Sequence, residues 1–142
     1  MDLRFYVLTF GPHSDPDSTK AALAKSNPEA VVQTLSAALG IGSSALELLA
    51  AQTLVAKGAN EMLARKPEVD FLLRVAGTSQ ITRAIKSVGA TKGKSFLLVL
   101  ASEGKRGLTV SGSMGRPMAR RPLNRKDMDS VEAGALLSAR RA

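Results

Sequence analysis

Apolar runs separated by turns rich in glycine and proline divide this chain into short predicted elements. Residues 3–10 are rich in Phe, Tyr, Val and Thr and end at a Gly-Pro turn pair, so the pattern predicts a first strand. Asp15 and Asp17 lie in the following loop on either side of Pro16. Turn and helix-cap chemistry explains these carboxylates better than a metal site or an acid–base pair does.

Two helices are expected next. Asn27, Pro28 and Glu29 form a helix-start pattern, and the apolar residues of 31–39 follow at helical spacing. A longer helix is predicted from Ser43 or Ser44 to about Arg65, with Gly58 softening it or splitting it in two. Its first half is almost entirely apolar, so we expect this half to be buried on more than one side.

Residues 69–101 predict a compact α/β unit. The run 69–76, VDFLLRVA, is rich in large apolar and β-branched residues and predicts a buried strand that ends at a glycine. Residues 81–88 predict a short helix capped by Thr78 or Ser79, and SFLLVLA, residues 95–101, predicts a second buried strand.

The character of the chain changes after residue 101. The segment 104–126 carries seven Lys or Arg residues and one short strand candidate, residues 108–112, and we expect it to be poorly ordered or ordered by a ligand. Residues 127–142 predict a terminal helix. The pattern as a whole predicts a single α/β (α+β) domain over 1–142, with a small mixed or antiparallel sheet packed by several helices.

Charge points towards a polyanionic partner. The net charge is +8 and the isoelectric point is near 10.3, and the last 42 residues contribute five of the eight net charges. On charge alone, nucleic-acid binding and a merely soluble basic surface explain the chain equally well. Only 4% of residues are aromatic, which argues against a sheet of aromatic side chains that stack on bases.

The residues offer no catalytic constellation. Cysteine is absent, which fits an intracellular protein, and the single histidine, His13, lies in a polar loop beside proline. GATKGKS, residues 89–95, lacks both the spacing and the strand-to-helix context of a phosphate loop. We therefore expect no enzyme, no cofactor and no metal site. The chain has no apolar run of membrane-spanning length and no signal-peptide pattern at its start, so we expect a cytoplasmic protein without a membrane partner.

The loop GTSQ, residues 77–80, is the best candidate for a binding site. It places backbone amides, hydroxyls and one side-chain amide at the N-terminus of a short helix, where the positive end of the helix dipole favours a phosphate. Arg83 and Lys86 extend this position into a basic track. An ordinary helix cap with a solvated charged face explains the same residues, and from the residues alone it is the preferred interpretation.

A longer pattern changes that balance. GTSQITRAIKSVGATKG, preceded by EVDFLLRVA and followed by an apolar run, resembles the CGI-type subunit of the KEOPS complex, the PRPK-binding protein family, in its archaeal form. The resemblance covers about residues 57–101, just under a third of the chain. The positions that match the archaeal pattern are Glu68, Gly77, Gln80, Ile81, Ala84, Ile85, Val88 and Gly89. Ser79 stands where archaeal members often have arginine, and segment 104–126 does not follow the family.

The resemblance implies a non-catalytic subunit with two partners. It would bind the atypical protein kinase of KEOPS and capture the single-stranded 3′ CCA end of tRNA, while another subunit attaches threonylcarbamoyl to the adenosine beside the anticodon. The residues assigned to tRNA are Gly77, Thr78, Gln80, Arg83 and Lys86. The residues assigned to the kinase are Ile85, Val88, Leu136 and Leu137, each of which is equally well explained as core.

Two other functions stay open at this stage. The chain could be a general RNA- or DNA-binding module that uses only its basic segment 104–126, or a small-molecule sensor or enzyme that uses the glycine loops. The sequence does not indicate an oligomeric state.

Overall fold

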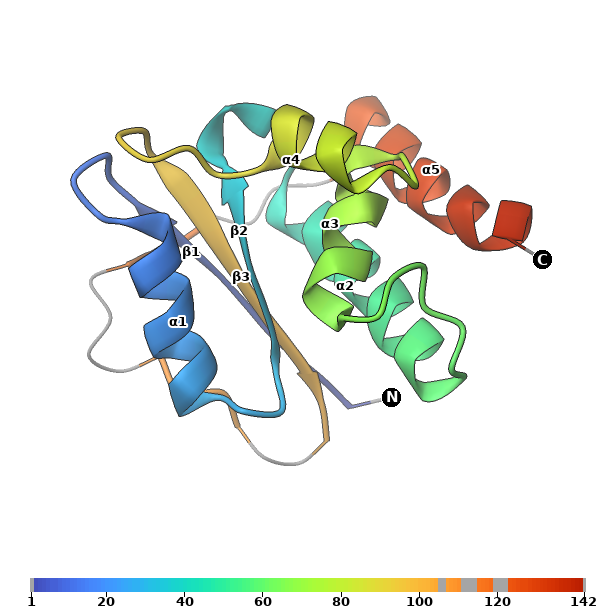
Figure 1. The fold of residues 1–142 in the computed structure, drawn as a ribbon, viewed down its shortest axis with the longest axis horizontal. Coiled ribbons are helices and arrows are strands. Elements are labelled where there is room, and N and C mark those ends of the chain that lie inside the picture. The colour runs from blue at the N-terminus through green and yellow to red at the C-terminus, as the bar shows by residue number, and fades with distance from the viewer. Residues whose placement is uncertain (1, 105–106, 111–114, 119–122, 142) are drawn as a thin grey trace. The chain divides into compact units, whose positions relative to one another are not determined.

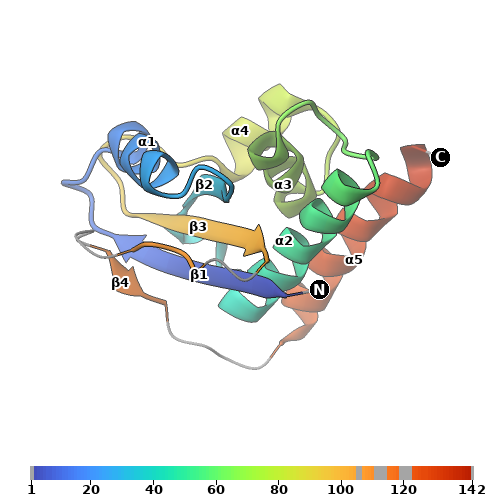
Figure 2. The ribbon, with the colours of Figure 1, turned by 90° about the horizontal axis from the view of Figure 1, so that it is seen from below.

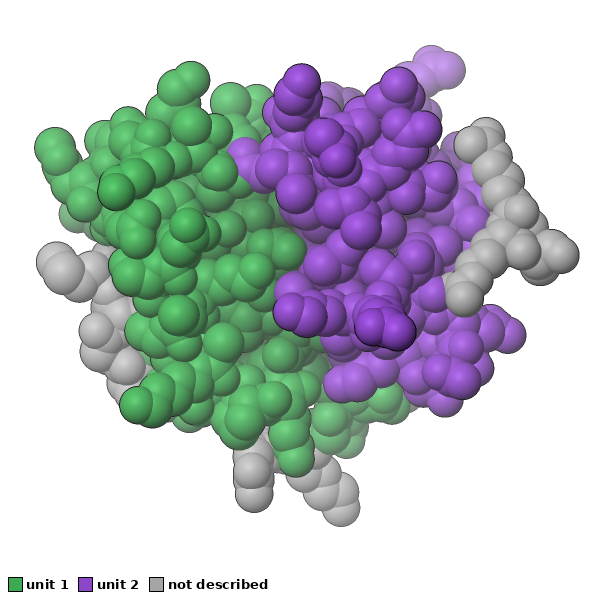
Figure 3. Space-filling model, viewed as in Figure 1, with its two compact units in different colours: residues 1–40, 90–118 green, residues 41–89, 119–142 purple. Residues whose placement is uncertain are grey.

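A computed structural model describes residues 2–104, 107–110, 115–118 and 123–141, and it has a mixed α/β fold, as predicted (Figure 1). The chain forms two compact units: unit 1 is residues 1–40 and 90–118, and unit 2 is residues 41–89 and 119–142 (Figure 3). The expectation of a single domain stays a prediction.

Unit 1 is built on a four-stranded antiparallel sheet with the strand order β2-β3-β1-β4. Its strands are β1 (Leu3–Phe10), β2 (Val31–Ser36), β3 (Phe96–Glu103) and β4 (Arg116–Pro117). The predicted strands at 3–10 and 95–101 are therefore confirmed as β1 and β3. These two strands pair along their whole length, from Leu3 opposite Glu103 to Phe10 opposite Phe96.

Helix α1 (Pro16–Ser26) packs against one face of this sheet (Figures 1 and 2). Leu23 of α1 belongs to a buried cluster with Leu8, Phe10, Val32, Phe96, Leu98 and Leu100 of the strands. The rings of Phe10 and Phe96 stack with their centroids 5.0 Å apart, an arrangement that adds to the stabilisation from burial alone.

The cap chemistry expected near Asp15 is confirmed, although the helix that it begins was not predicted. The Asp15 carboxylate accepts a hydrogen bond from the Ser18 amide at 3.1 Å, and Pro16 occupies the first turn. Helix α1 was missed because its sequence, PDSTKAALAKS, has few large apolar residues and only a weak apolar stripe.

The helix predicted over residues 31–39 is wrong. Residues 31–36 are strand β2, and Ala37–Leu39 form a single 3-10 turn. Val31, Val32 and Thr34 are β-branched and fit the sheet, where β2 pairs with β3. Asn27, interpreted as the start of a helix, is instead the C-cap of α1.

Unit 2 is a group of four helices. They are α2 (Ser43–Gly58), α3 (Pro67–Ala76), α4 (Ile81–Val88) and α5 (Arg125–Arg141). Helix α3 packs against the other three, and α2 also packs against α5. Helix α4 and the terminal helix α5 confirm the predictions at 81–88 and 127–142. Helix α2 begins as predicted but ends at Gly58 rather than near Arg65, and an irregular segment then leads to α3.

The buried strand predicted at residues 69–76 is also wrong, because this run is helix α3. Pro67 lies in the first turn, Glu68 and Asp70 place negative charge at its N-terminus, and Gly77 ends it in the left-handed conformation with φ +70°. Residues 70–75 are all buried, so the run resembles a buried strand in composition.

Segment 104–126 is described only in part. Residues 108–110 of the predicted strand 108–112 have no regular structure, and residues 111–112 lie outside the described part of the chain. Residues 116–117 form β4 and pair with Thr9 and Leu8 of β1. The expectation that the segment is poorly ordered or ordered by a ligand falls mainly on residues 105–106, 111–114 and 119–122, which are not described. Within the described residues, we find no helix with the length and apolar character to span a membrane.

Candidate nucleic-acid interface

The candidate loop lies at the junction of α3 and α4. The Gly77 amide donates to the carbonyl oxygens of Leu73, at 2.9 Å, and Arg74, and the Thr78 amide donates to Leu73 at 3.3 Å. These bonds complete the C-terminus of α3. The prediction that the loop offers free amides is therefore wrong at Gly77 and Thr78, whose N–H groups are already used.

The N-terminus of α4 differs from its predicted form. Its N-cap is Gln80 rather than Thr78 or Ser79, and it has no side-chain cap hydrogen bond. The Thr78 hydroxyl instead accepts from the Gln80 amide at 3.2 Å. Because no side chain caps this helix, the first-turn amides of α4 can donate hydrogen bonds to a bound anion. The first turn of α4, all of it described, contains Arg83 and no acidic residue.

A hollow of about 620 Å³ opens beside this junction. Its volume is within the usual range for small-ligand sites, about 300–1,000 Å³. Gly77, Thr78, Ser79 and Arg83 contribute the polar side of the hollow, and the apolar side chains of Leu63, Ala76 and Leu137 contribute the rest. A polar, positively charged rim beside an apolar wall suits a nucleotide, which has a phosphate and a flat base.

A buried ion pair holds the elements that surround the hollow. Arg74 Nε lies 2.7 Å from Asp70 Oδ1, and the side chains of both residues are almost completely buried. The other Asp70 oxygen accepts from the Leu63 amide at 2.8 Å, which fixes the segment before α3. The Arg74 guanidinium also donates to the Gly134 carbonyl oxygen and to the Ser138 hydroxyl, so it fixes α5, which carries Leu137.

The structure brings together only part of the predicted set. Three of the five residues assigned to tRNA, Gly77, Thr78 and Arg83, line the hollow, whereas Gln80 and Lys86 are exposed on α4 without lining it. Leu137, assigned to the kinase, lines the same hollow and is 6% exposed.

The other residues assigned to the kinase divide by exposure. Ile85 is 56% exposed and Leu136 is 52% exposed, so both side chains are accessible to a partner. Val88 is 5% exposed and packs in the core of unit 2. Its apolar character is therefore explained by burial in the core, the alternative that the sequence left open for all four residues.

Sequence reasoning missed Leu63 and Ala76. Ala76 was placed in a strand, and Leu63 was placed within a helix that in fact ends at Gly58. The available signal was the proline at position 67, which suits the first turn of a helix and would have predicted α3 with a loop before it.

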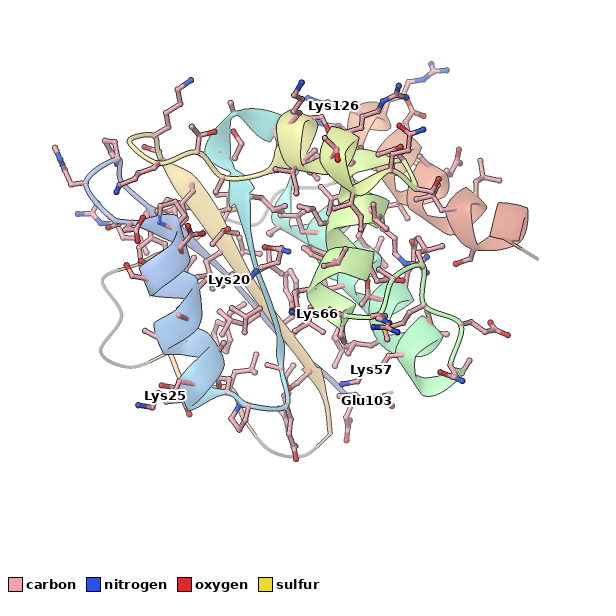
Figure 4. All side chains as sticks on the ribbon, in the orientation of Figure 1. Lys20, Lys25, Lys57, Lys66, Glu103 and Lys126 are labelled. Atoms are coloured by element: carbon pink, nitrogen blue, oxygen red, sulfur yellow. The ribbon has the colours of Figure 1, made fainter. Side chains whose placement is uncertain are left out.

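Positive charge is spread over unit 2. Lys57 lies in the last turn of α2, Lys66 directly precedes α3, and Lys126 lies near the start of α5 (Figure 4). The side chains of these lysines are exposed. These lysines contribute positive potential to the surface of unit 2, and among the described residues that line the hollow the Lys or Arg residue is Arg83.

The described residues contain no group of three or more His, Asp or Glu side chains that could hold a metal ion. In comparisons with known proteins, no protein-family model and no curated protein matches this chain.

Proposed function

We propose that this chain is a non-catalytic subunit of the KEOPS complex that binds the complex's kinase and recruits tRNA through its 3′ CCA end for threonylcarbamoyl modification. The observation that carries the proposal is the hollow at the junction of α3 and α4, where the loop with the KEOPS-like pattern meets Arg83. The proposal rests on that pattern together with the chemistry of the hollow.

The first step is phosphate binding at the start of α4. The uncapped first-turn amides and the positive end of the helix dipole favour an anion, and the Arg83 guanidinium adds a charged donor. Ser79, at the position where archaeal members often have arginine, lines the hollow and offers a neutral hydroxyl. Arg83 therefore takes a larger share of the phosphate contact in this chain.

The second step is recognition of a single-stranded end. Only unpaired nucleotides can turn their bases into a protein pocket without breaking a duplex. Leu63, Ala76 and Leu137 provide an apolar wall against which a base can pack. No aromatic side chain of the described residues lines the hollow, so the contact with the base is aliphatic packing and not ring stacking.

The test of the RNA part compares full-length tRNA with tRNA trimmed of its CCA end, by fluorescence anisotropy with the full chain. We expect trimming to weaken binding at least about tenfold, which corresponds to about 1.4 kcal/mol. Replacing Arg83 and Lys86 by glutamine should reduce the slope of log affinity against log salt by about 0.7 for each lost phosphate contact. The matched control neutralises Lys92 and Lys94, two exposed lysines of unit 1.

Equal affinity for trimmed and full-length tRNA would contradict the 3′-end proposal. If the Arg83 and Lys86 variant also keeps the wild-type salt slope, the general nucleic-acid-binding module with a basic segment at 104–126 is the better explanation.

The kinase part of the proposal uses the two exposed residues, Ile85 and Leu136. We expect Ile85→Asp and Leu136→Asp each to reduce co-purification with the KEOPS kinase, because a buried carboxylate in an apolar interface is costly. Met128→Asp is the control, since Met128 is also an exposed residue of α5, at 53%. Unchanged co-purification of both Ile85 and Leu136 variants would rule out this contact surface.

A further inference from the structure

A second hollow in unit 2 is unrelated to the GTSQ loop. This α2–α5 groove, of about 480 Å³, runs between α2 and α5 and is mainly apolar. Leu48 and Val55 of α2 line one side, and Val131 and Ala135 of α5 line the other. Leu48 is 44% exposed and Val55 is 57% exposed. Exposed apolar side chains that lie together along a groove are a common feature of protein–protein contact surfaces.

The polar groups within the groove narrow the choice of occupant. The Arg74 guanidinium donates to Asp70, Gly134 and Ser138, and Gln52 Nε2 donates to the Val131 carbonyl oxygen at 3.0 Å. Gln52 Oε1 has no hydrogen-bond partner among the described residues, but it is buried, so these groups leave little exposed hydrogen-bonding capacity for a polar ligand. Glu61, an exposed residue at the groove, adds a negative charge. The groove therefore suits an apolar helix face that is accompanied by a positive charge.

Helix α4 of this chain has that combination. It packs against α3 through the buried residues Ala84 and Val88, which leaves Ile81, at 48%, and Ile85, at 56%, exposed one turn apart. Lys86 is exposed beside Ile85. A helix of this kind, with an isoleucine ridge and a lysine, is complementary to an apolar groove with a carboxylate.

The length of helix α4 also agrees with the exposed length of the groove. Leu48 and Val55 are seven positions apart on α2, which corresponds to about 10.5 Å along the helix at about 1.5 Å per residue. Helix α4 has eight residues and is therefore about 12 Å long. One copy of α4 can cover the exposed length of the groove.

We propose that the α2–α5 groove binds helix α4 of a second copy of this chain. Ile81 and Ile85 of one copy pack between Leu48 and Val55 of α2 and the facing residues of α5, and Lys86 meets Glu61 of the other copy. When each copy contributes its α4 to the groove of the other, the two contacts close as a two-fold dimer. A contact built on one short helix is small, so the association is weak and reversible.

Sedimentation equilibrium of the full chain, between about 10 μM and about 500 μM, tests this proposal, because dissociation constants in this range are typical of small interfaces. We expect the weight-average mass to rise with concentration towards that of a dimer. Val55→Glu and Ile85→Glu should each weaken dimerisation at least about tenfold, and Met128→Glu, a change at an exposed residue of α5 outside the groove, should leave it unchanged. Circular dichroism confirms that the variants fold.

A charge swap tests the specific pairing. Glu61→Lys and Lys86→Glu should each weaken the dimer, and the double variant should restore it, since the pair is then present with its signs exchanged. A wild-type chain that stays monomeric over the whole range overturns the proposal, and so does an equal effect of Val55→Glu and Met128→Glu. Ile85 and Lys86 also belong to the proposed kinase and tRNA contacts, but the samples contain neither RNA nor kinase, so failure of the dimer and failure of the proposed function are distinguishable.

Discussion

The buried ion pair of α3 offers the sharpest test of what stabilises unit 2. Asp70 is 0% exposed and Arg74 is 1% exposed, and their shortest contact is 2.7 Å. The Thr53 hydroxyl donates to the same Asp70 oxygen, also at 2.7 Å. Because both charges are out of water, each depends on the other and on these hydrogen bonds for its compensation.

Arg74→Met removes the positive charge and keeps much of the side-chain volume. Among the described residues, the donors that the buried Asp70 carboxylate then keeps are the neutral Thr53 hydroxyl and Leu63 amide, and the Gly134 carbonyl oxygen loses its bond from Arg74. Breaking a buried pair in this way costs about 3–5 kcal/mol. With a urea m-value of about 2 kcal/mol/M, the unfolding midpoint should fall by about 1.5–2.5 M.

Urea unfolding followed by far-UV circular dichroism measures this loss. Arg83→Met is the matched control, because Arg83 is exposed on α4 and its replacement should change stability by less than about 0.5 kcal/mol. The double variant Asp70→Asn with Arg74→Met should be more stable than Arg74→Met alone by at least about 1 kcal/mol, because the uncompensated charge is gone. A loss below about 1 kcal/mol for Arg74→Met, or a double variant no more stable than the single one, would refute the reasoning.

Two further predictions concern helix ends and close packing. Asp127 accepts from the Gly42 amide at 3.0 Å and from the Asn124 amide at 3.1 Å, so Asp127→Ala should cost about 2 kcal/mol in chemical unfolding; a loss no larger than that of the exposed Asp129→Ala would contradict this. Gly134→Ala should cost about 1–3 kcal/mol, because its Cβ would lie 2.6 Å from Leu49 Cδ2. Gly58→Ala, which meets open space, should be neutral or stabilise by up to about 1 kcal/mol, and thermal unfolding of the two alanine variants should separate them clearly.

Local signals in the sequence were sufficient where one interpretation dominated. The run 3–10 is rich in β-branched and aromatic residues and forms β1, and residues 81–88 form α4 before Gly89. Asp15 also acts as the cap that its sequence neighbours indicated. In each case, intrinsic propensity and the flanking turn residues favour the same structure, so the tertiary context had nothing to override.

One physical reason explains both wrong predictions of secondary structure. A helix was predicted where residues 31–36 form strand β2, and a strand was predicted at residues 69–76, which lie in helix α3. Both runs are buried on nearly all sides, and full burial removes the alternation of apolar and polar positions that distinguishes a strand from a helix. Pairing with β3 decides that residues 31–36 are a strand. In α3, Asp70 and Arg74 stand one helical turn apart, and that spacing joins them in a buried pair only when the run is helical.

In the candidate site too, some residues could be selected from the sequence and others are placed only by the tertiary structure. The sequence by itself was enough to select Gly77, Thr78 and Arg83, because the loop and the first turn of α4 are adjacent in the chain. It could not place Leu63 and Leu137 beside them, because 74 positions of the chain separate these two residues. Their positions depend on Asp70, which holds the Leu63 amide, and on Arg74, which holds α5. Only the tertiary structure decides such contacts, since they arise from packing between helices and leave no periodic signal in any single helix.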